Sequence, residues 1–211
     1  MMDLQMNDFD SFAADALPMM LKLIAPSLAE KYPDEISVLG MWNFESPVQS
    51  IGATLYYSWE NEFILSLLGD FDFEGGMKEK AGFYKAFQWE QWFMKNLREW
   101  VQGKSLTSKI CGTKKSINYD NKSCINLLVK AFEGAVQGLK LKFGEDMNLW
   151  RWGNLHRQHY KHALTRSPLK PFFHKSYAAP GSRRSLNVAV YYSVAESGFD
   201  SLHSPNQRVI V

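Results

Sequence analysis

The chain has 211 residues, of which 45% are hydrophobic and 22% are charged, so its composition matches an ordinary globular protein and excludes extensive disorder. The formal net charge of +2 hides an asymmetry, because residues 1–100 carry 16 acidic and 7 basic side chains whereas residues 101–211 carry 6 and 17. The basic residues form no long run, and no stretch of roughly 18 apolar residues occurs, so we expect neither a nucleic-acid partner nor a membrane span.

The first predicted elements are helices separated by prolines. Asp10 or Ser11 can cap a helix whose apolar residues recur at helical spacing over 14–24. Pro26 is expected to end this helix, because proline cannot donate the backbone hydrogen bond that would continue it. A short helix over about 36–42 follows.

Two positions compete for the start of the next helix. Ser46-Pro47 can open it, with serine as the cap and proline at the first helical position, and Ser50 is the alternative cap. Aromatic residues at helical spacing are typical of a packed core rather than of a ligand cage. The helices expected here cover about 53–68, 82–102 and 127–141, and Gly69, Gly103 and Gly144 lie near their ends.

After Trp150 the pattern changes from helical to extended. Residues 186–194 and 207–211 are rich in β-branched and aromatic side chains, which predicts two strands. The second would end the chain at an apolar run with an unpaired edge, so we expect a truncated chain. The predicted fold class is α+β, as a single partial domain over 1–211 with a mainly helical part at about 8–149 and a strand and loop part at about 150–211.

The most specific motif is Trp150-Arg151-Trp152-Gly153-Asn154-Leu155-His156, which follows the helix end at Phe143-Gly144. It belongs to an ordered set that opens with Asn7-Asp8-Phe9-Asp10-Ser11 and continues through Pro180-Gly181 and Asn187-Val188. In this order, the segments resemble an internal to C-terminal part of the β-subunit of penicillin acylases, which are N-terminal-nucleophile hydrolases. The resemblance spans nearly the whole chain and is loose over 70–122.

The resemblance implies an αββα sandwich and the hydrolysis of linear amides, such as acylated β-lactams or acyl-homoserine lactones. In that family a precursor cuts itself to expose an N-terminal serine, whose α-amino group acts as the general base. An α-amine titrates near pH 8, so it can serve this role near neutral pH. The chemistry needs no cofactor.

The matched segments lie downstream of the family's nucleophile and oxyanion-binding asparagine, so the resemblance assigns no catalytic residue and no metal here. It implies a structural role for Trp150, Trp152, Gly153 and His156. The chain alone is expected to be inactive and to need the missing remainder of the acylase precursor or its subunits. The opposite charges of the two halves then reflect mutual attraction or docking on that remainder, with nucleic-acid binding as the weaker alternative. A non-catalytic binding or scaffold protein derived from this fold is the alternative function.

Lacking a signal peptide, the chain as written is expected in the cytoplasm, whereas a full-length family precursor is expected in the periplasm or outside the cell. Gly181-Ser182 resembles a family processing site, but only 30 residues remain from Ser182 onward, so a polar turn is predicted instead. His156, His159 and His162 lack a neighbouring carboxylate or cysteine, so we predict no metal site and expect His156 as a buried hydrogen-bonding group beside Trp152.

Three further sequence patterns do not predict a functional site. The acidic segment 70–75 lacks the ligand spacing of a calcium loop, and no G-x-S-x-G elbow is present. Cys111 and Cys124 form no C-x-x-C pair, and a disulfide between them is compatible with the sequence but not implied by it.

Overall fold

The computed structural model describes residues 2–69, 121–160, 172, 174–191, 198–201 and 204. Several expectations fall outside these residues and stay predictions. They are the tryptophan-rich helix over 82–102, the acidic turn over 70–75, the strand over 207–211, the position of His162 and the pairing of Cys111.

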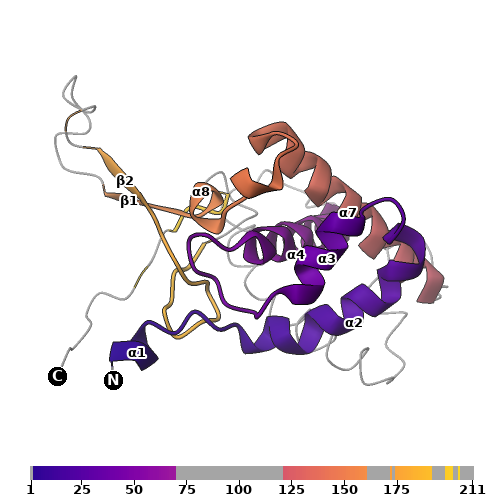
Figure 1. Cartoon of the computed structure of the whole chain (residues 1–211), viewed down its shortest axis with the longest axis horizontal. Helices are drawn as coiled ribbons and strands as arrows, with labels where there is room; N and C mark the ends of the chain where they lie inside the picture. The colour runs from indigo at the N-terminus through magenta and orange to yellow at the C-terminus, as the bar shows by residue number, and fades with distance from the viewer. Residues whose placement is uncertain are drawn as a thin grey trace, which may run out of the picture.

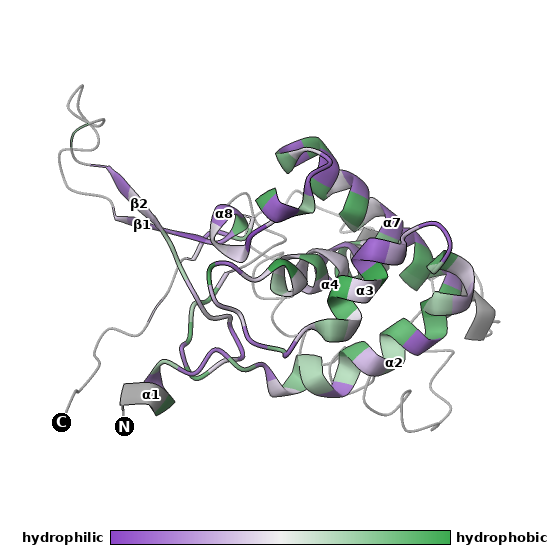
Figure 2. Ribbon diagram, in the orientation of Figure 1, coloured by the Kyte–Doolittle hydropathy of each residue, from purple (hydrophilic) through white to green (hydrophobic). Residues whose placement is uncertain are grey.

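Four long helices form the body of the described part: α2 (Ser11–Leu28), α3 (Pro33–Met41), α4 (Ile51–Gly69) and α7 (Asn121–Phe143). They lie together, whereas the short α1 (Met2–Gln5) sits apart near the N-terminus (Figure 1). Helix α4 packs against α7 and α3, and α2 packs against α7 and α3. Hydrophobic segments concentrate on α2, α4 and α7, which indicates that these helices share a core (Figure 2).

Helix α4 is the centre of this core, because residues 52–61 are all buried. Trp59 and Phe63 of α4 pack with Phe132 of α7, and the rings of Trp59 and Phe132 meet edge to face at 5.2 Å. The indole N–H of Trp59 donates to the carbonyl of Leu128 at 3.0 Å, which satisfies its polar atom. A helix that is apolar on most sides is expected to be enclosed in this way.

The predicted start of α2 is confirmed, and its predicted end is wrong. The Asp10 carboxylate accepts from the backbone N–H of Phe12 at 3.0 Å and of Ala13 at 2.9 Å, as a helix cap does. Pro26 lies inside the helix, which continues to Leu28. The loss of one hydrogen bond at proline is offset there because Leu28 is buried in the core.

Ser50 rather than Ser46 caps α4, since the N–H of Ala53 donates to Ser50 Oγ at 3.1 Å. The Ser46-Pro47 start is therefore wrong. The Ser46 N–H donates to the carbonyl of Asp8 at 3.2 Å, which holds this segment extended beside the N-terminal residues. At the other end of the body, Gly144 ends α7 as predicted, with φ of 87° in the left-handed region that favours glycine.

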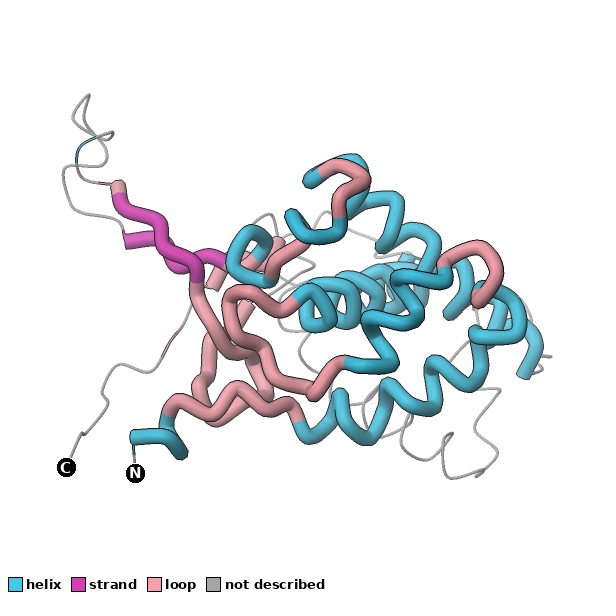
Figure 3. Tube along the Cα trace, viewed as in Figure 1, coloured by secondary structure: helices cyan, strands magenta, loops and turns pink. Residues whose placement is uncertain are grey.

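The strands of the described part are not the predicted ones. β1 (Arg157–Tyr160) and β2 (Lys175–Ala178) lie side by side (Figure 3). They form an antiparallel pair in which Gln158 is the partner of Tyr177. The strand predicted over 186–194 is wrong in its described part, 186–191, where the bridge of Val188 to Ser182 is isolated. A turn brings the Ala189 N–H back onto the carbonyl of Ser182 at 3.0 Å, so the segment does not run on as a strand.

Helices followed by a small antiparallel sheet confirm the predicted α+β class. The pair β1 and β2 extends away from the helices, and the short α8 (Trp152–Leu155) lies between them (Figure 1). A short 3-10 turn, η1 (Met147–Leu149), leads into α8. Among the helices that are described, none is both long and apolar enough to cross a bilayer.

Candidate functional site

The tryptophans of the 150–156 motif join segments that are distant in the sequence. Trp150 and Trp152 are fully buried. The indole N–H of Trp150 donates to the carbonyl of Gly144 at 2.8 Å, and that of Trp152 donates to the carbonyl of Gly181 at 2.9 Å. The motif thereby ties the end of α7 to the Pro-Gly-Ser turn that follows β2.

Gly153 sits where no side chain fits. Its N–H donates to the carbonyl of Val48 at 2.8 Å, which holds α8 against the loop before α4. A Cβ atom at this position would lie 2.7 Å from the Cβ of Ala178 and 2.9 Å from the Cβ of Val48. Both distances are shorter than van der Waals contact, so this close approach of three backbone segments requires glycine.

His156 is buried beside Trp152, as expected from the sequence. The two rings stack with centroids 4.7 Å apart and an angle of 18° between their planes. His156 Nδ1 lies 2.5 Å from the carbonyl oxygen of Phe199, so Nδ1 carries the proton and donates it. Burial lowers the pKa of His156 to about 4, with the Phe199 hydrogen bond acting in the opposite direction. The ring is therefore neutral at pH 7.

A buried cluster of charged groups lies between α2, α4 and the turn after β2. Arg184 donates to Asp10 Oδ2 at 2.8 Å and to both oxygens of Glu60, at 2.7 and 3.0 Å. Arg183 also pairs with Glu60, at 3.4 Å. Tyr57 donates to Asp10 Oδ2 at 3.0 Å. The two cations and two carboxylates balance, as buried charges require.

Aromatic rings and neighbouring charges also determine the protonation of this cluster. The Arg184 guanidinium lies 4.9 Å from the ring centroid of Phe12 and 5.7 Å from that of Tyr57. Burial acts to lower the pKa of Arg184, but attraction by Glu60 and Asp10 outweighs it and raises this pKa well above its ordinary value. Burial, reinforced by the Asp10 charge, raises the pKa of Tyr57 well above its ordinary value. Tyr57 therefore stays protonated and acts as a donor.

Ser182 forms the predicted turn and is fully buried. Its N–H donates to Ser185 Oγ at 2.8 Å, and its own Oγ accepts from the N–H of Arg184 at 3.2 Å. Gly181 before it has φ of 84°, and a Cβ there would collide with the carbonyl of Asn187 at 2.0 Å. The turn therefore presents Arg183 and Arg184 to the charged cluster and keeps the serine hydroxyl inside the protein.

His156 and His159, the two histidines of the spaced set that the structure describes, bond different groups. His156 precedes β1 and bonds the carbonyl of Phe199, whereas His159 lies on β1 and contacts other groups. His159 Nδ1 is 3.3 Å from His174 Nε2, and its Nε2 is 2.9 Å from Asp200 Oδ2. In the described portion of the chain, no three acidic, histidine or cysteine side chains are grouped to hold a metal ion. The sequence did not predict the contacts with His174 and Asp200.

A comparison with models of known protein families identifies the family of this chain. The family model described as Penicillin amidase matches residues 1–211. The chain belongs to the penicillin amidase family. A comparison with curated protein sequences gives no match. The family match confirms the resemblance and supports a penicillin-acylase-like amidohydrolase at the level of the family.

In this penicillin amidase family chain, the burial of His156 beside Trp152 was predicted from the sequence, whereas the charged cluster was not. Glu60 falls within the apolar stripe of α4, and a charged residue in such a stripe indicates a buried ionic partner. The adjacent pair Arg183-Arg184 after a Pro-Gly-Ser turn is the matching signal. Neither signal identifies its partner in the sequence, because Glu60 and Arg184 are 124 residues apart.

Proposed function

We propose that this chain forms a structural part of a penicillin-acylase-like amidohydrolase, and that it hydrolyses no amide by itself. The observation that supports this is the state of Ser182, the serine that most resembles a family nucleophile. Its side chain is buried, and its hydroxyl accepts a backbone N–H. An attacking serine needs an exposed hydroxyl with a general base in hydrogen-bond reach.

A second reason is that the Ser182 nitrogen lies within the chain. As an amide donating to Ser185, it has no lone pair for proton transfer, whereas an N-terminal serine offers a free amine. We infer that the attacking hydroxyl and its amine come from the rest of the acylase precursor or its subunits. In that assembly, residues 1–211 form a partial domain whose β1 and β2 add to an αββα sandwich.

We infer a structural role for the 150–156 motif within that assembly. Trp152, Gly153 and His156 are buried, and each bonds the backbone of another segment: Trp152 the turn after β2, Gly153 the loop before α4, and His156 the carbonyl of Phe199. The acyl-amide substrate is then bound mainly by the part of the precursor that carries the attacking serine. A full-length precursor of this kind is expected in the periplasm or outside the cell.

The test is an assay of the purified chain on the p-nitroanilide of an acyl group. We expect no p-nitroaniline release above the buffer rate, because loss of a nucleophile costs on the order of a millionfold in rate. Ser182→Ala is the matched variant. Turnover by the wild-type chain, shown to be free of other proteins, would overturn the proposal, and its loss in Ser182→Ala would identify Ser182 as the nucleophile.

The charged cluster favours a second candidate function, a non-catalytic binding or scaffold protein. Arg184 bonds Asp10, 174 residues away, so the described segments close on one another without a partner. A self-sufficient module of this kind unfolds in one cooperative transition. Differential scanning calorimetry distinguishes the two candidates: a calorimetric enthalpy equal to the van't Hoff enthalpy supports the module, and a broad, low-enthalpy transition supports the dependent part.

A further inference from the structure

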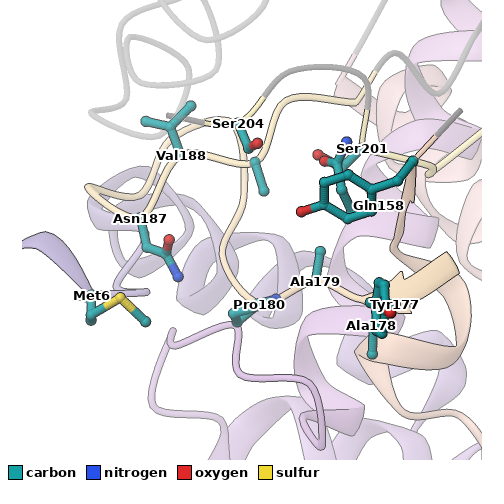
Figure 4. Close-up of a pocket in the computed structure, with 12 residues that line it drawn as sticks. Met6, Gln158, Tyr177, Ala178, Ala179, Pro180, Asn187, Val188, Ser201 and Ser204 are labelled. Carbon is teal, nitrogen blue, oxygen red and sulfur yellow. The ribbon is translucent and has the colours of Figure 1, made fainter. Parts of the chain in front are cut away.

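Two histidines meet on one face of the β1 and β2 pair, outside the buried charged cluster. His159 is the register partner of Ser176, and His174 lies two residues before Ser176, so the two histidines lie diagonally on the same face. Tyr160 and Tyr177 belong to the opposite face, where they line a pocket of about 340 Å³ (Figure 4). The two histidines do not line that pocket and are argued separately from it.

Asp200 determines which nitrogen of His159 carries the proton. The Ser201 N–H donates to the carbonyl of Arg157 at 2.8 Å, which holds this segment against the start of β1. Asp200 Oδ2 lies 2.9 Å from His159 Nε2. Because a carboxylate only accepts, Nε2 carries the proton of the neutral ring, and Nδ1 keeps its lone pair. A carboxylate on the far nitrogen is the arrangement that orients many metal-binding histidines.

The lone pair of His159 Nδ1 faces a second ring nitrogen. His174 Nε2 is 3.3 Å away, and the ring centroids are 5.4 Å apart, so the rings meet through these nitrogens rather than stack. A zinc ion with two Zn–N bonds of roughly 2.0–2.1 Å at the tetrahedral angle separates the nitrogens by about 3.3 Å. One ion can therefore reach both nitrogens after a small rotation of the rings, whose terminal torsions are broad.

His174 can supply its nitrogen without losing another hydrogen bond. Its Nδ1 is buried and has no hydrogen-bond partner among the residues that the structure describes. The proton of the neutral ring can therefore sit on Nδ1, which leaves Nε2 as a ligand. Arg157 shares this face, but its guanidinium bonds Ser176 and the carbonyl of Gly153. The charge that bonds His159 directly is the negative one of Asp200.

We propose that His159 Nδ1 and His174 Nε2 bind a divalent ion of the zinc and copper class, with Asp200 as the outer partner of His159. Imidazole suits these ions, whereas Mg²⁺ and Ca²⁺ prefer oxygen ligands. Two protein ligands are fewer than the three or four of permanent zinc sites, in keeping with the lack of a group of three among the described residues. Water fills the remaining positions, and the bound ion exchanges with solvent.

The bound ion would tie β1 to the residue before β2. His159 is 28% exposed and Asp200 is 35% exposed, so an ion can reach the pair from solvent. The spacing of histidines in the sequence did not predict this site, because His174 lies 15 residues after His159. The inference does not rest on the proposed function, since it concerns binding and needs no turnover.

The test is isothermal titration calorimetry of the purified full chain, made without a histidine tag, with zinc chloride and with magnesium chloride. We expect saturable zinc binding and no comparable magnesium binding. His159→Gln and His174→Gln should each weaken zinc binding by at least about tenfold, and Asp200→Ala by about tenfold, because the ring of His159 is no longer oriented. Glu145→Gln removes an exposed carboxylate after α7 and should bind zinc like the wild type.

A second measurement identifies the ligand atoms in the wild-type chain and so does not depend on the folding of a variant. In NMR spectra of the ring nitrogens, zinc should shift the signals of His159 Nδ1 and His174 Nε2 and leave His159 Nε2 protonated. Circular dichroism checks the fold of each variant. Absence of saturable zinc binding, unchanged zinc affinity in both folded histidine variants, magnesium binding as tight as zinc binding, or coordination through His159 Nε2 would overturn the proposal.

Discussion

The guanidinium of Arg184 and the carboxylate of Glu60, 124 residues apart in the sequence, meet in two hydrogen bonds of 2.7 and 3.0 Å. The side chains are only 13% and 2% exposed, so little water screens them. Asp10 joins the same guanidinium and also caps α2, which means that one cation holds α2, α4 and the turn after β2. The stability of the helical body therefore depends on a residue far outside it.

Arg184→Met is expected to lower the free energy of unfolding by about 3–5 kcal/mol. The cause is less the lost attraction than the two carboxylates, Asp10 and Glu60, which remain buried with fewer partners. Urea denaturation followed by tryptophan fluorescence measures the change. Arg151→Met is the matched control, because Arg151 is exposed and donates to the nearby backbone carbonyl of Asn148, and its expected effect is below about 0.5 kcal/mol.

Adding Glu60→Gln to Arg184→Met should restore at least about 1 kcal/mol, since it removes one of the stranded charges. In the wild-type background the same Glu60→Gln change should destabilise the protein, because it weakens a satisfied pair. If the two changes proved additive, the carboxylate and the guanidinium would not be energetically coupled, and the cluster would not hold the fold as described.

His156 predicts a loss of stability in mild acid. Its pKa falls from 6.5 in the unfolded chain to about 4 in the folded protein, because burial penalises the charged ring. Below pH 6.5, His156 binds a proton in the unfolded chain but not in the folded protein. The free energy of unfolding is therefore highest above pH 6.5 and decreases as the pH falls toward 4. Between pH 7.5 and 5 the expected loss is about 2 kcal/mol.

His156→Asn isolates this effect, because asparagine retains an N–H for the Phe199 carbonyl but does not titrate. The variant should be less stable than the wild type at pH 7.5, since it loses the stacking on Trp152. The gap between the two proteins should narrow by about 2 kcal/mol at pH 5. A gap that is the same at both pH values would mean that His156 titrates alike in the folded and unfolded chains.

Local signals in the sequence were enough for some of the helix ends, although not for the end of α2 at Leu28. The Asp10 cap and the Gly144 end each depend on one residue and its own backbone, so they could be predicted. The strands β1 and β2 could not, because they contain no β-branched residue and are stabilised by pairing between Gln158 and Tyr177. Residues 186–191 have strand-like composition, yet the Asn187 N–H donates to Asn7, which diverts the segment.

The competing starts of α4 can be tested directly. Ser50→Ala removes the hydroxyl that accepts the Ala53 N–H and should cost about 1 kcal/mol of unfolding free energy. Ser66→Ala, within the same helix, is the control: Ser66 Oγ donates to the Glu62 carbonyl in its own helix, and alanine has the better helix propensity. Its expected effect is neutral or slightly stabilising, measured by thermal and urea unfolding.

Adding a single methyl group at two glycines should have opposite effects on stability. Gly153→Ala places a Cβ 2.7 Å from Ala178 and 2.9 Å from Val48, and neither neighbour is the flexible end of a long side chain. The backbones must separate, so we expect a loss of about 1–3 kcal/mol. Gly138→Ala meets nothing within 4 Å on α7 and should gain about 0.5–1 kcal/mol through helix propensity. Urea denaturation of both variants measures the contrast, and a neutral Gly153→Ala would show that α8 does not press on the loop before α4 and on β2.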